Sequence, residues 1–176
     1  MRKFATGPKA FFHSIFYLCS PLVFIFFLSN PLWAKDMVGR LGVGMTNQFI
    51  NGIPALSLKL QRTPLYAIGA MLGVKFSNKD HGGYAGGVKL YRNIFDEPNL
   101  NFYGAGAVSL ININSGGNDS TGVQVDATMG SEFHLAGLES LGFSVEFGFT
   151  LSHLYNDFTL ETMGNHLIRA AVHFYL

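Results

Sequence analysis

The chain has 176 residues, a formal net charge of +1 and only 13% charged residues. This balance leaves no basic surplus of the kind that nucleic-acid-binding proteins carry. A single cysteine, Cys19, excludes an intramolecular disulfide framework, and the length favours one domain.

The first 34 residues are typical of a secretory signal peptide. They begin with three basic residues, namely Arg2, Lys3 and Lys9. An apolar run follows over 11–28, and the small Ala34 stands where a signal peptidase would cut. The alternative is an uncleaved transmembrane helix, because 11–33 is long enough to span a bilayer. Cleavage after Ala34 would leave residues 35–176 as one domain without cysteine, which suits an oxidising compartment.

The rest of the sequence alternates with a period of two. In GFSVEFGFTL (142–151), large apolar residues alternate with small or polar ones, and VQVDATMGSEFH (123–134) and PALSLKLQ (54–61) follow the same rule. Successive side chains of a strand point to opposite faces, so this pattern predicts strands with one apolar and one polar face. The run LNFYGAGAVSLIN (100–112) is ambiguous, because Gly and Ala occupy both of its faces.

Turn signals divide these runs into eight predicted strands. The seven predicted connections are 47–53, 63–64, 78–83, 96–99, 113–121, 136–142 and 153–165. Long and short connections alternate along the chain, as in transmembrane barrels with tight turns at one end and longer loops at the other. We therefore predict an all-β fold, a closed antiparallel up-and-down eight-stranded transmembrane β-barrel.

Alternation alone leaves two barrels open. A soluble, lipocalin-like barrel would place the apolar face inside around a ligand, whereas a membrane barrel places it outside. Charges at strand centres favour the membrane barrel, because both signs recur on the polar face and can pair inside a narrow lumen. These residues are Arg40, Lys59, Lys75, Lys89, Asp126, Glu132, Glu146 and Arg169.

Two further features point the same way. Glycines gather on the polar face, and an eight-stranded barrel has an interior just wide enough for side chains, so bulky polar groups need small neighbours. Aromatic residues gather near strand ends, as they do in the interfacial girdles of membrane barrels. These aromatic residues are Tyr66, Phe76, Tyr84, Phe95, Phe133, Phe143, Tyr155 and Phe174.

The signal-like start, the alternating strands and the final stretch LIRAAVHFYL (167–176) together resemble the small bacterial outer-membrane β-barrels, such as OmpX and the membrane domain of outer-membrane protein A. The resemblance is one of pattern and carries no specific motif. It implies that the last strand is a signal for the barrel-assembly machinery, with outward residues Ile168, Ala170, Val172, Phe174 and Leu176. The family usually ends on Phe, and Leu176 is a departure that bears on the efficiency of assembly.

The charges of the polar face, which we call the lumen charge network, have two possible roles. Charged groups inside a membrane protein must pair or meet water, which predicts a structural network of ion pairs. The alternative is a gated ion or proton path that runs through the same residues. The sequence predicts no metal site and no cofactor.

His153 raises the question of an enzyme. Lipid A deacylases among the eight-stranded barrels carry a His-x-Ser-Asn motif, and SHLYND (152–157) resembles it in part. Tyr155 stands where the nucleophilic Ser would be, and Ser152 points to the other face of the strand, out of reach of a general base at His153. We therefore expect an interfacial His and Tyr pair and no enzyme activity.

The sequence favours an outer-membrane barrel of structural or interaction type. The expected partners are outer-membrane lipid, lipopolysaccharide and, during biogenesis, the barrel-assembly machinery, and the expected state is a monomer that binds no nucleic acid. The alternatives are a narrow pore or carrier for small compounds, a lipid A hydrolase and a soluble lipocalin-like binder. We expect the apolar loop residues Phe49, Ile50, Ile53, Phe158 and Leu160 to pack on each other above the barrel rather than dock on a partner.

Overall fold

The computed structural model describes residues 37–77, 82–97, 99–115, 118–135, 137–155, 157–162 and 168–176. The predicted signal peptide, residues 1–34, lies outside the described residues. Among the residues that are described, no helix has the length and apolar character needed to cross a membrane.

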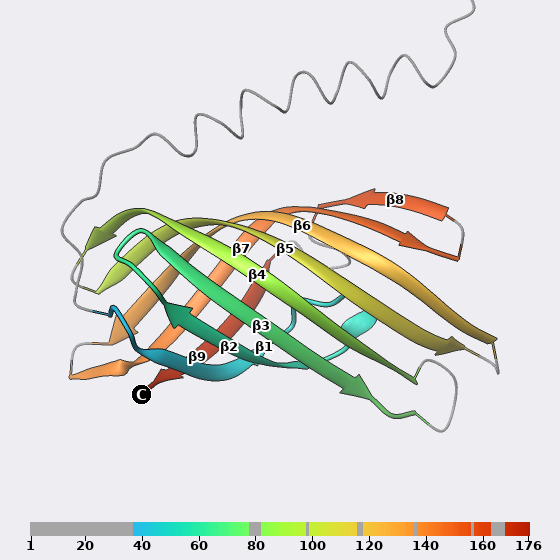
Figure 1. Cartoon of the computed structure of the whole chain (residues 1–176), viewed down its shortest axis with the longest axis horizontal. Coiled ribbons are helices and arrows are strands. Elements are labelled where there is room, and N and C mark those ends of the chain that lie inside the picture. Colours follow the sequence, from blue (N-terminus) through green and yellow to red (C-terminus); the bar gives the residue numbers. More distant parts are fainter. Residues whose placement is uncertain are drawn as a thin grey trace, which may run out of the picture. The chain divides into compact units, whose positions relative to one another are not determined.

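Nine strands and one short 3-10 helix make up the described fold (Figure 1). The strands are β1 (Leu41–Thr46), β2 (Ala55–Gln61), β3 (Tyr66–Lys75), β4 (Gly82–Glu97), β5 (Leu100–Ser115), β6 (Asn118–Leu135), β7 (Leu138–Leu154), β8 (Asp157–Glu161) and β9 (Arg169–Tyr175). The 3-10 helix η1 (Ile50–Gly52) lies between β1 and β2.

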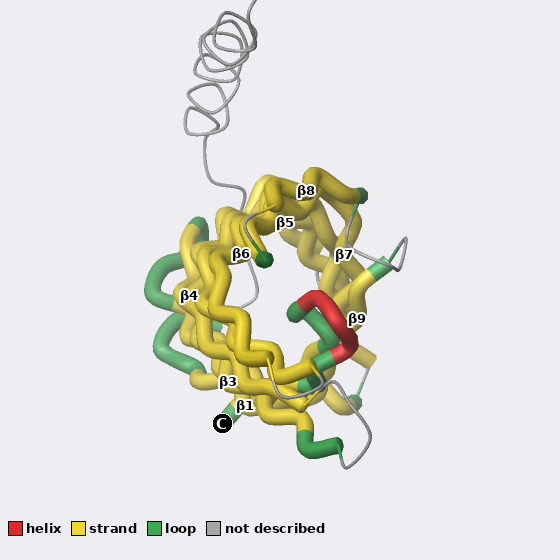
Figure 2. The backbone as a smooth tube through the Cα atoms, turned by 90° about the vertical axis from the view of Figure 1, so that its right-hand side faces the viewer, coloured by secondary structure: helices red, strands yellow, loops and turns green. Residues whose placement is uncertain are grey.

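The strands form a closed antiparallel barrel with up-and-down connections, which confirms the predicted all-β barrel and its strand order. Each strand from β1 to β7 pairs with the next, and β9 pairs with both β7 and β1 to close the ring. We call the end with the β2–β3, β4–β5 and β6–β7 connections the turn end, and the opposite end the loop end. Figure 2 shows the ring of strands, with η1 inside its outline.

The eighth barrel strand is divided into β8 and β9, which both run antiparallel to β7. β8 pairs with Thr150–Leu154 near the loop end, and β9 pairs with Leu141–Glu146 near the turn end. Residues 147–149 of β7 lie between the two paired stretches. The predicted loop 153–165 is therefore wrong over 153–154, which end β7, and over 157–161, which form β8.

Four other predicted connections also include strand residues. Residues 82–83 and 96–97 belong to β4, 113–115 and 118–121 pair across β5 and β6, and 138–142 belong to β7. Polar residues such as Asn114 and Asp119 suggested a loop, but they face each other across an extended hairpin. A strand that continues past the barrel has no core to face, so its sequence does not have to alternate.

The wall is uneven in length. β1, β2 and β3 have 6, 7 and 10 residues, whereas β4 to β7 have 16 to 18 residues each. The wall formed by β4 to β7 therefore extends further than the wall formed by β1 to β3.

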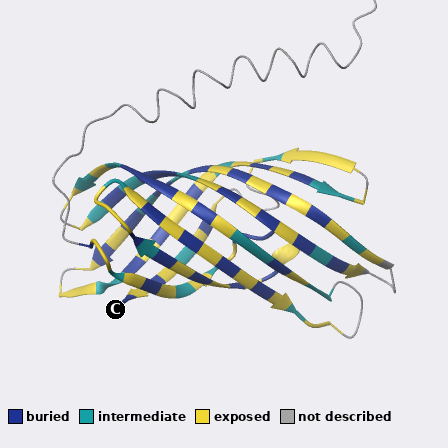
Figure 3. Ribbon diagram, viewed as in Figure 1, coloured by how far each residue is buried: buried dark blue, intermediate teal, exposed yellow. Residues whose placement is uncertain are grey.

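Buried and exposed residues alternate along the strands, as predicted (Figure 3). In β6, Gln124 and Asp126 are buried inside the barrel, whereas Val123 and Val125 are 40% and 41% exposed on its outside. The ambiguous strand β5 turns its odd-numbered residues inward, among them Tyr103 and the apolar Ile111. The inside of the barrel is thus not wholly polar.

The lumen charge network as the candidate functional site

Six of the eight predicted charges lie buried in the lumen as three ion pairs. Lys59 Nζ lies 2.7 Å from Glu132 Oε2, and Lys89 Nζ lies 2.7 Å from Glu146 Oε1. Arg169 Nη1 lies 3.2 Å from Asp126 Oδ1, while Arg169 Nη2 donates to Thr150 Oγ1 at 3.0 Å. The partners of each pair come from strands that are not neighbours, so each pair connects parts of the wall that at least one other strand separates.

Hydroxyl groups complete the hydrogen bonding of the carboxylates. Tyr103 OH donates to Glu146 Oε1 at 2.8 Å, and Tyr175 OH donates to Glu132 Oε1 at 2.6 Å. Thr150 Oγ1 donates to Asp126 Oδ1 at 2.6 Å. Burying a charge costs several kcal/mol unless it is both paired and hydrogen-bonded. All three carboxylates meet both conditions.

Aromatic rings enclose the lysines of this network. Lys59 Nζ lies 4.8 Å from the ring centre of Tyr91 and 5.0 Å from that of Tyr103. Lys89 Nζ lies 5.0 Å from the ring centre of the same Tyr91. The faces of these rings attract cations, so they stabilise the two ammonium groups where water is scarce.

Small residues make room for the large polar groups, as the glycine pattern suggested. A Cβ atom at Gly130 would lie 2.7 Å from Glu146 Cγ and 3.0 Å from the ring of Tyr103. One at Gly42 would lie 2.8 Å from the ring of Tyr175. A methyl group at either site would displace a member of the network.

The connection between β1 and β2 fills the loop end of the lumen. Gln48 Nε2 donates to Asp126 Oδ2 at 3.0 Å, and Lys89 Nζ donates to Gln48 Oε1 at 2.9 Å. Gln124 binds the same segment through two hydrogen bonds of 3.1 Å. Its Nε2 donates to the Gln48 carbonyl oxygen, and its Oε1 accepts from Ile50 N. We call residues 47–53 the plug.

The plug also packs through apolar contacts. Phe49 and Ile53 are 3% and 2% exposed and lie in a cluster of inward side chains. The other buried members are Ala55, Met71, Ala85, Ala107, Ile111 and Ile113. The prediction that the loop residues pack on each other above the barrel is therefore wrong. Phe49 and Ile53 enter the lumen, whereas Phe158 and Leu160 stay 69% exposed.

Arg40 and Lys75 lie apart from the three pairs, at opposite ends of the barrel. Arg40 Nη2 donates to Ser140 Oγ at 3.1 Å and to the Tyr175 carbonyl oxygen at 3.2 Å, near the turn end. Lys75 Nζ donates to the carbonyl oxygen of Asn51 at 3.0 Å, at the loop end. The charge pattern predicted both at strand centres on the polar face, but Arg40 directly precedes β1 and Lys75 is the last residue of β3.

Sequence reasoning did not assign several members of this site. His173 Nε2 lies 2.9 Å from Ser57 Oγ, and His134 Nε2 lies 3.8 Å from Glu132 Oε2. Tyr91 is two residues from Lys89 on β4, so strand periodicity could have found it. Gln48 follows no periodicity, because it lies in a connection between strands.

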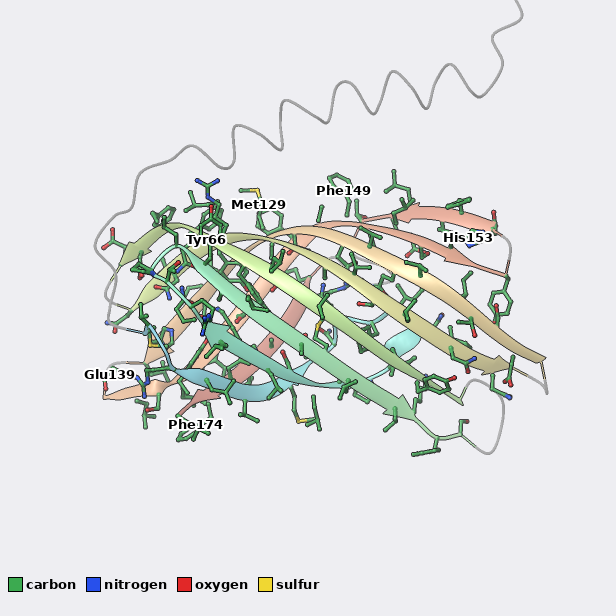
Figure 4. The ribbon with its side chains drawn as sticks, viewed as in Figure 1. Tyr66, Met129, Glu139, Phe149, His153 and Phe174 are labelled. Carbon is green, nitrogen blue, oxygen red and sulfur yellow. The ribbon has the colours of Figure 1, made fainter. Side chains whose placement is uncertain are left out.

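The predicted assembly signal covers β9 and the residue on each side of it. Its residues Ile168, Ala170, Val172, Phe174 and Leu176 are all exposed outside the barrel. Arg169, His173 and Tyr175 alternate with them and are buried inside. Figure 4 shows Phe174 projecting away from the barrel. The Leu176 amide donates to the Leu41 carbonyl oxygen at 2.9 Å, which continues the β9–β1 pairing.

His153 lies on the outer face of β7 at the loop end, far from Glu139 at the turn end (Figure 4). Its ring centre is 4.3 Å from that of Phe158 on β8. Ser152 is 5% exposed and points into the lumen, on the other side of the wall. The Ser152 hydroxyl group therefore points away from His153. Within the described part of the chain, no three His, Cys, Asp or Glu side chains are grouped to hold a metal ion.

Comparison with known proteins found no matching family model, no matching curated protein and no matching solved structure.

Proposed function

We propose that the chain is an exported outer-membrane β-barrel of structural or interaction type, with no chemistry in its core. One observation carries the proposal, namely that the large apolar side chains cover the outside of the barrel. The exposed large apolar side chains of the strands together form an apolar band on the outer face. Examples are Leu72, Leu110 and Phe149, which are 69%, 63% and 58% exposed. Burying one such side chain gains about 1.5–3 kcal/mol, so a band of this size favours contact with lipid.

The inner face supports the same proposal. A soluble barrel with a ligand cavity would have apolar residues inside, whereas the centre of this lumen holds three ion pairs. Exposed aromatic residues occur towards both ends, with Tyr66 and Phe174 near the turn end and Tyr84 and Tyr155 near the loop end. Such girdles mark the two interfaces of membrane barrels.

The filled lumen favours a structural protein over a pore or carrier. Lys89 is hydrogen-bonded to both Glu146 and Gln48, and the plug packs against the wall above them. An ion would have to displace the plug and separate at least one buried pair. The proposed partners are accordingly outer-membrane lipid and lipopolysaccharide, with the barrel-assembly machinery acting on β9 during biogenesis, and the proposed state is a monomer.

Cell fractionation combined with gel mobility tests this proposal. Expressed in a Gram-negative host, the full chain should appear in the outer-membrane fraction and shift in mobility when heated before electrophoresis. A chain that lacks residues 1–34 is the matched control and should stay in the cytoplasm. The purified protein should give no steady conductance in a planar bilayer. A soluble, periplasmic protein would contradict the membrane proposal, and steady conductance would contradict the structural one.

A further inference from the structure

A groove of about 650 Å³ lies at the loop end, beside the β3–β4 connection. Its polar lining comes from Lys75 and Ser77 at the end of β3, from Asn112 and Asn114 on β5 and from Asp119 on β6, and Tyr84 on β4 forms part of its wall. Tyr84, Asn112, Asn114 and Asp119 share the outward parity of Val88, Leu110 and Val123. These four residues open the groove on the outer face of the barrel wall, while Lys75, which has the inward parity, lines its edge at the loop end.

Strand register places this groove directly above the apolar band. One row across the wall contains Leu72, Leu110 and Val123. The next row towards the loop end contains Val74, Tyr84, Asn112 and Thr121, and the row after it contains Asn114 and Asp119. The outer face thus changes from apolar to hydrogen-bonding within one row of residues.

Cross-strand hydrogen bonds hold the polar side chains of the groove in place. Asn112 Nδ2 donates to Thr121 Oγ1 at 3.0 Å, and Asn114 Nδ2 donates to Asp119 Oδ1 at 2.5 Å. An amide has a second N–H and a carbonyl oxygen, and a carboxylate has a second oxygen. Each pair can therefore present both a donor and an acceptor to a ligand without losing its internal bond.

The chemistry of the groove fits a sugar ring. Adjacent donors and acceptors match vicinal hydroxyl groups, and the exposed rings of Tyr84 and Phe76, at 62% and 93%, offer apolar faces for the C–H side of a sugar. Among the described residues that line the groove, Lys75 and Asp119 are the charged ones, and their charges are opposite. This balance favours hydroxyl groups over a cluster of phosphates.

We propose that this groove binds the saccharide headgroup of an outer-leaflet glycolipid. The sugar lies against Tyr84, Asn112, Asn114 and Asp119, and the acyl chains continue down the wall over Leu110 and Val88. The continuity of polar groove and apolar band favours a lipid-linked sugar over a free one, because only an amphiphile uses both surfaces. This inference rests on the proposed membrane location.

The test compares lipids bound to the refolded protein in lauryldimethylamine oxide, a detergent without sugar. Native mass spectrometry measures the binding of rough lipopolysaccharide, of phosphatidylglycerol and of the detached core oligosaccharide. The wild-type protein should prefer lipopolysaccharide to both other probes. The double variant Asn112→Ala/Asn114→Ala removes two hydrogen-bonding groups and should weaken lipopolysaccharide binding about tenfold. Tyr84→Ala should weaken it as well.

Phe158→Ala is the matched control, because Phe158 is an exposed aromatic residue at the loop end that does not line the groove. It should bind lipopolysaccharide as the wild type does. Equal binding of phosphatidylglycerol, equal binding of the detached oligosaccharide, or unchanged affinity in the groove variants would each overturn the glycolipid site. A heat-modifiable barrel without any lipid preference would overturn the site alone, whereas a protein that is folded and soluble without detergent would overturn the membrane location too.

Discussion

The inner and outer faces of the barrel wall are built by the same strands, yet their chemistry is opposite. On β7, Glu146 is 4% exposed and paired inside, while its neighbours Val145 and Phe147 are 39% and 51% exposed outside. A charge is stable inside because a partner and several hydroxyl groups meet it there. In the proposed membrane location the outer face offers no such partners, so position on a strand decides whether a charge is tolerated.

The largest effect is expected inside, where one partner of a buried pair is removed. Lys89→Met leaves the Glu146 carboxylate without its cation and should lower the free energy of unfolding by about 3–5 kcal/mol. Urea unfolding of the protein in lipid vesicles measures this. The double variant Lys89→Met/Glu146→Leu removes both charges and should recover much of the loss. Equal instability of the single and double variants would show that pairing is not what stabilises the lumen.

A charge placed on the outer face should have the next largest effect. Val172→Lys puts an ammonium group on the outside of β9 and, in the proposed membrane location, should destabilise the barrel by about 2–4 kcal/mol. Ala171→Lys is the matched control on the inner face and should be better tolerated. The heat-modifiable fraction in outer membranes measures assembly of both variants. If both assembled as the wild type does, the role assigned to β9 would be wrong.

The plug extends the comparison between the two faces of the wall. It is a connection between strands, yet its side chains are buried and hydrogen-bonded like those of the inner face. Gln48 is 1% exposed and bonds to both Asp126 and Lys89. Gln48→Ala leaves these groups with fewer partners and should cost about 1–3 kcal/mol. Hydrogen exchange at the Ile50 amide should become faster, while Phe158→Ala should leave it unchanged. Unchanged exchange in Gln48→Ala would mean that apolar packing alone holds the plug.

Much of this fold could be predicted from the sequence, because a barrel wall imposes a strict period of two. The facing of 123–134 and of 142–151 followed directly from that period, and so did the inward direction of six network charges. The pairing itself could not be predicted. Lys59 meets Glu132 across the lumen, and such a contact depends on strand tilt and register rather than on parity.

Three features could not be predicted from the sequence, each for its own physical reason. The plug lies in a connection, where no period constrains Gln48 or Phe49. β5 carries small residues on both faces, so Tyr103 and Ile111 gave no clear direction. The extended hairpin carries polar residues and glycine on both faces over 114–121, and strands of that kind resemble loops in composition.

The smallest effect is expected at Lys75. This residue has the same parity as the inward residues of β3, but it is the last residue of that strand. Its ammonium group is exposed and donates to one backbone carbonyl oxygen, that of Asn51. Water can replace this bond, so Lys75→Met should change the free energy of unfolding by less than about 1 kcal/mol. The same urea experiment measures it beside Lys89→Met. A loss as large as that of Lys89→Met would mean that strand parity, rather than burial with a partner, sets the energetic value of a charge in this barrel.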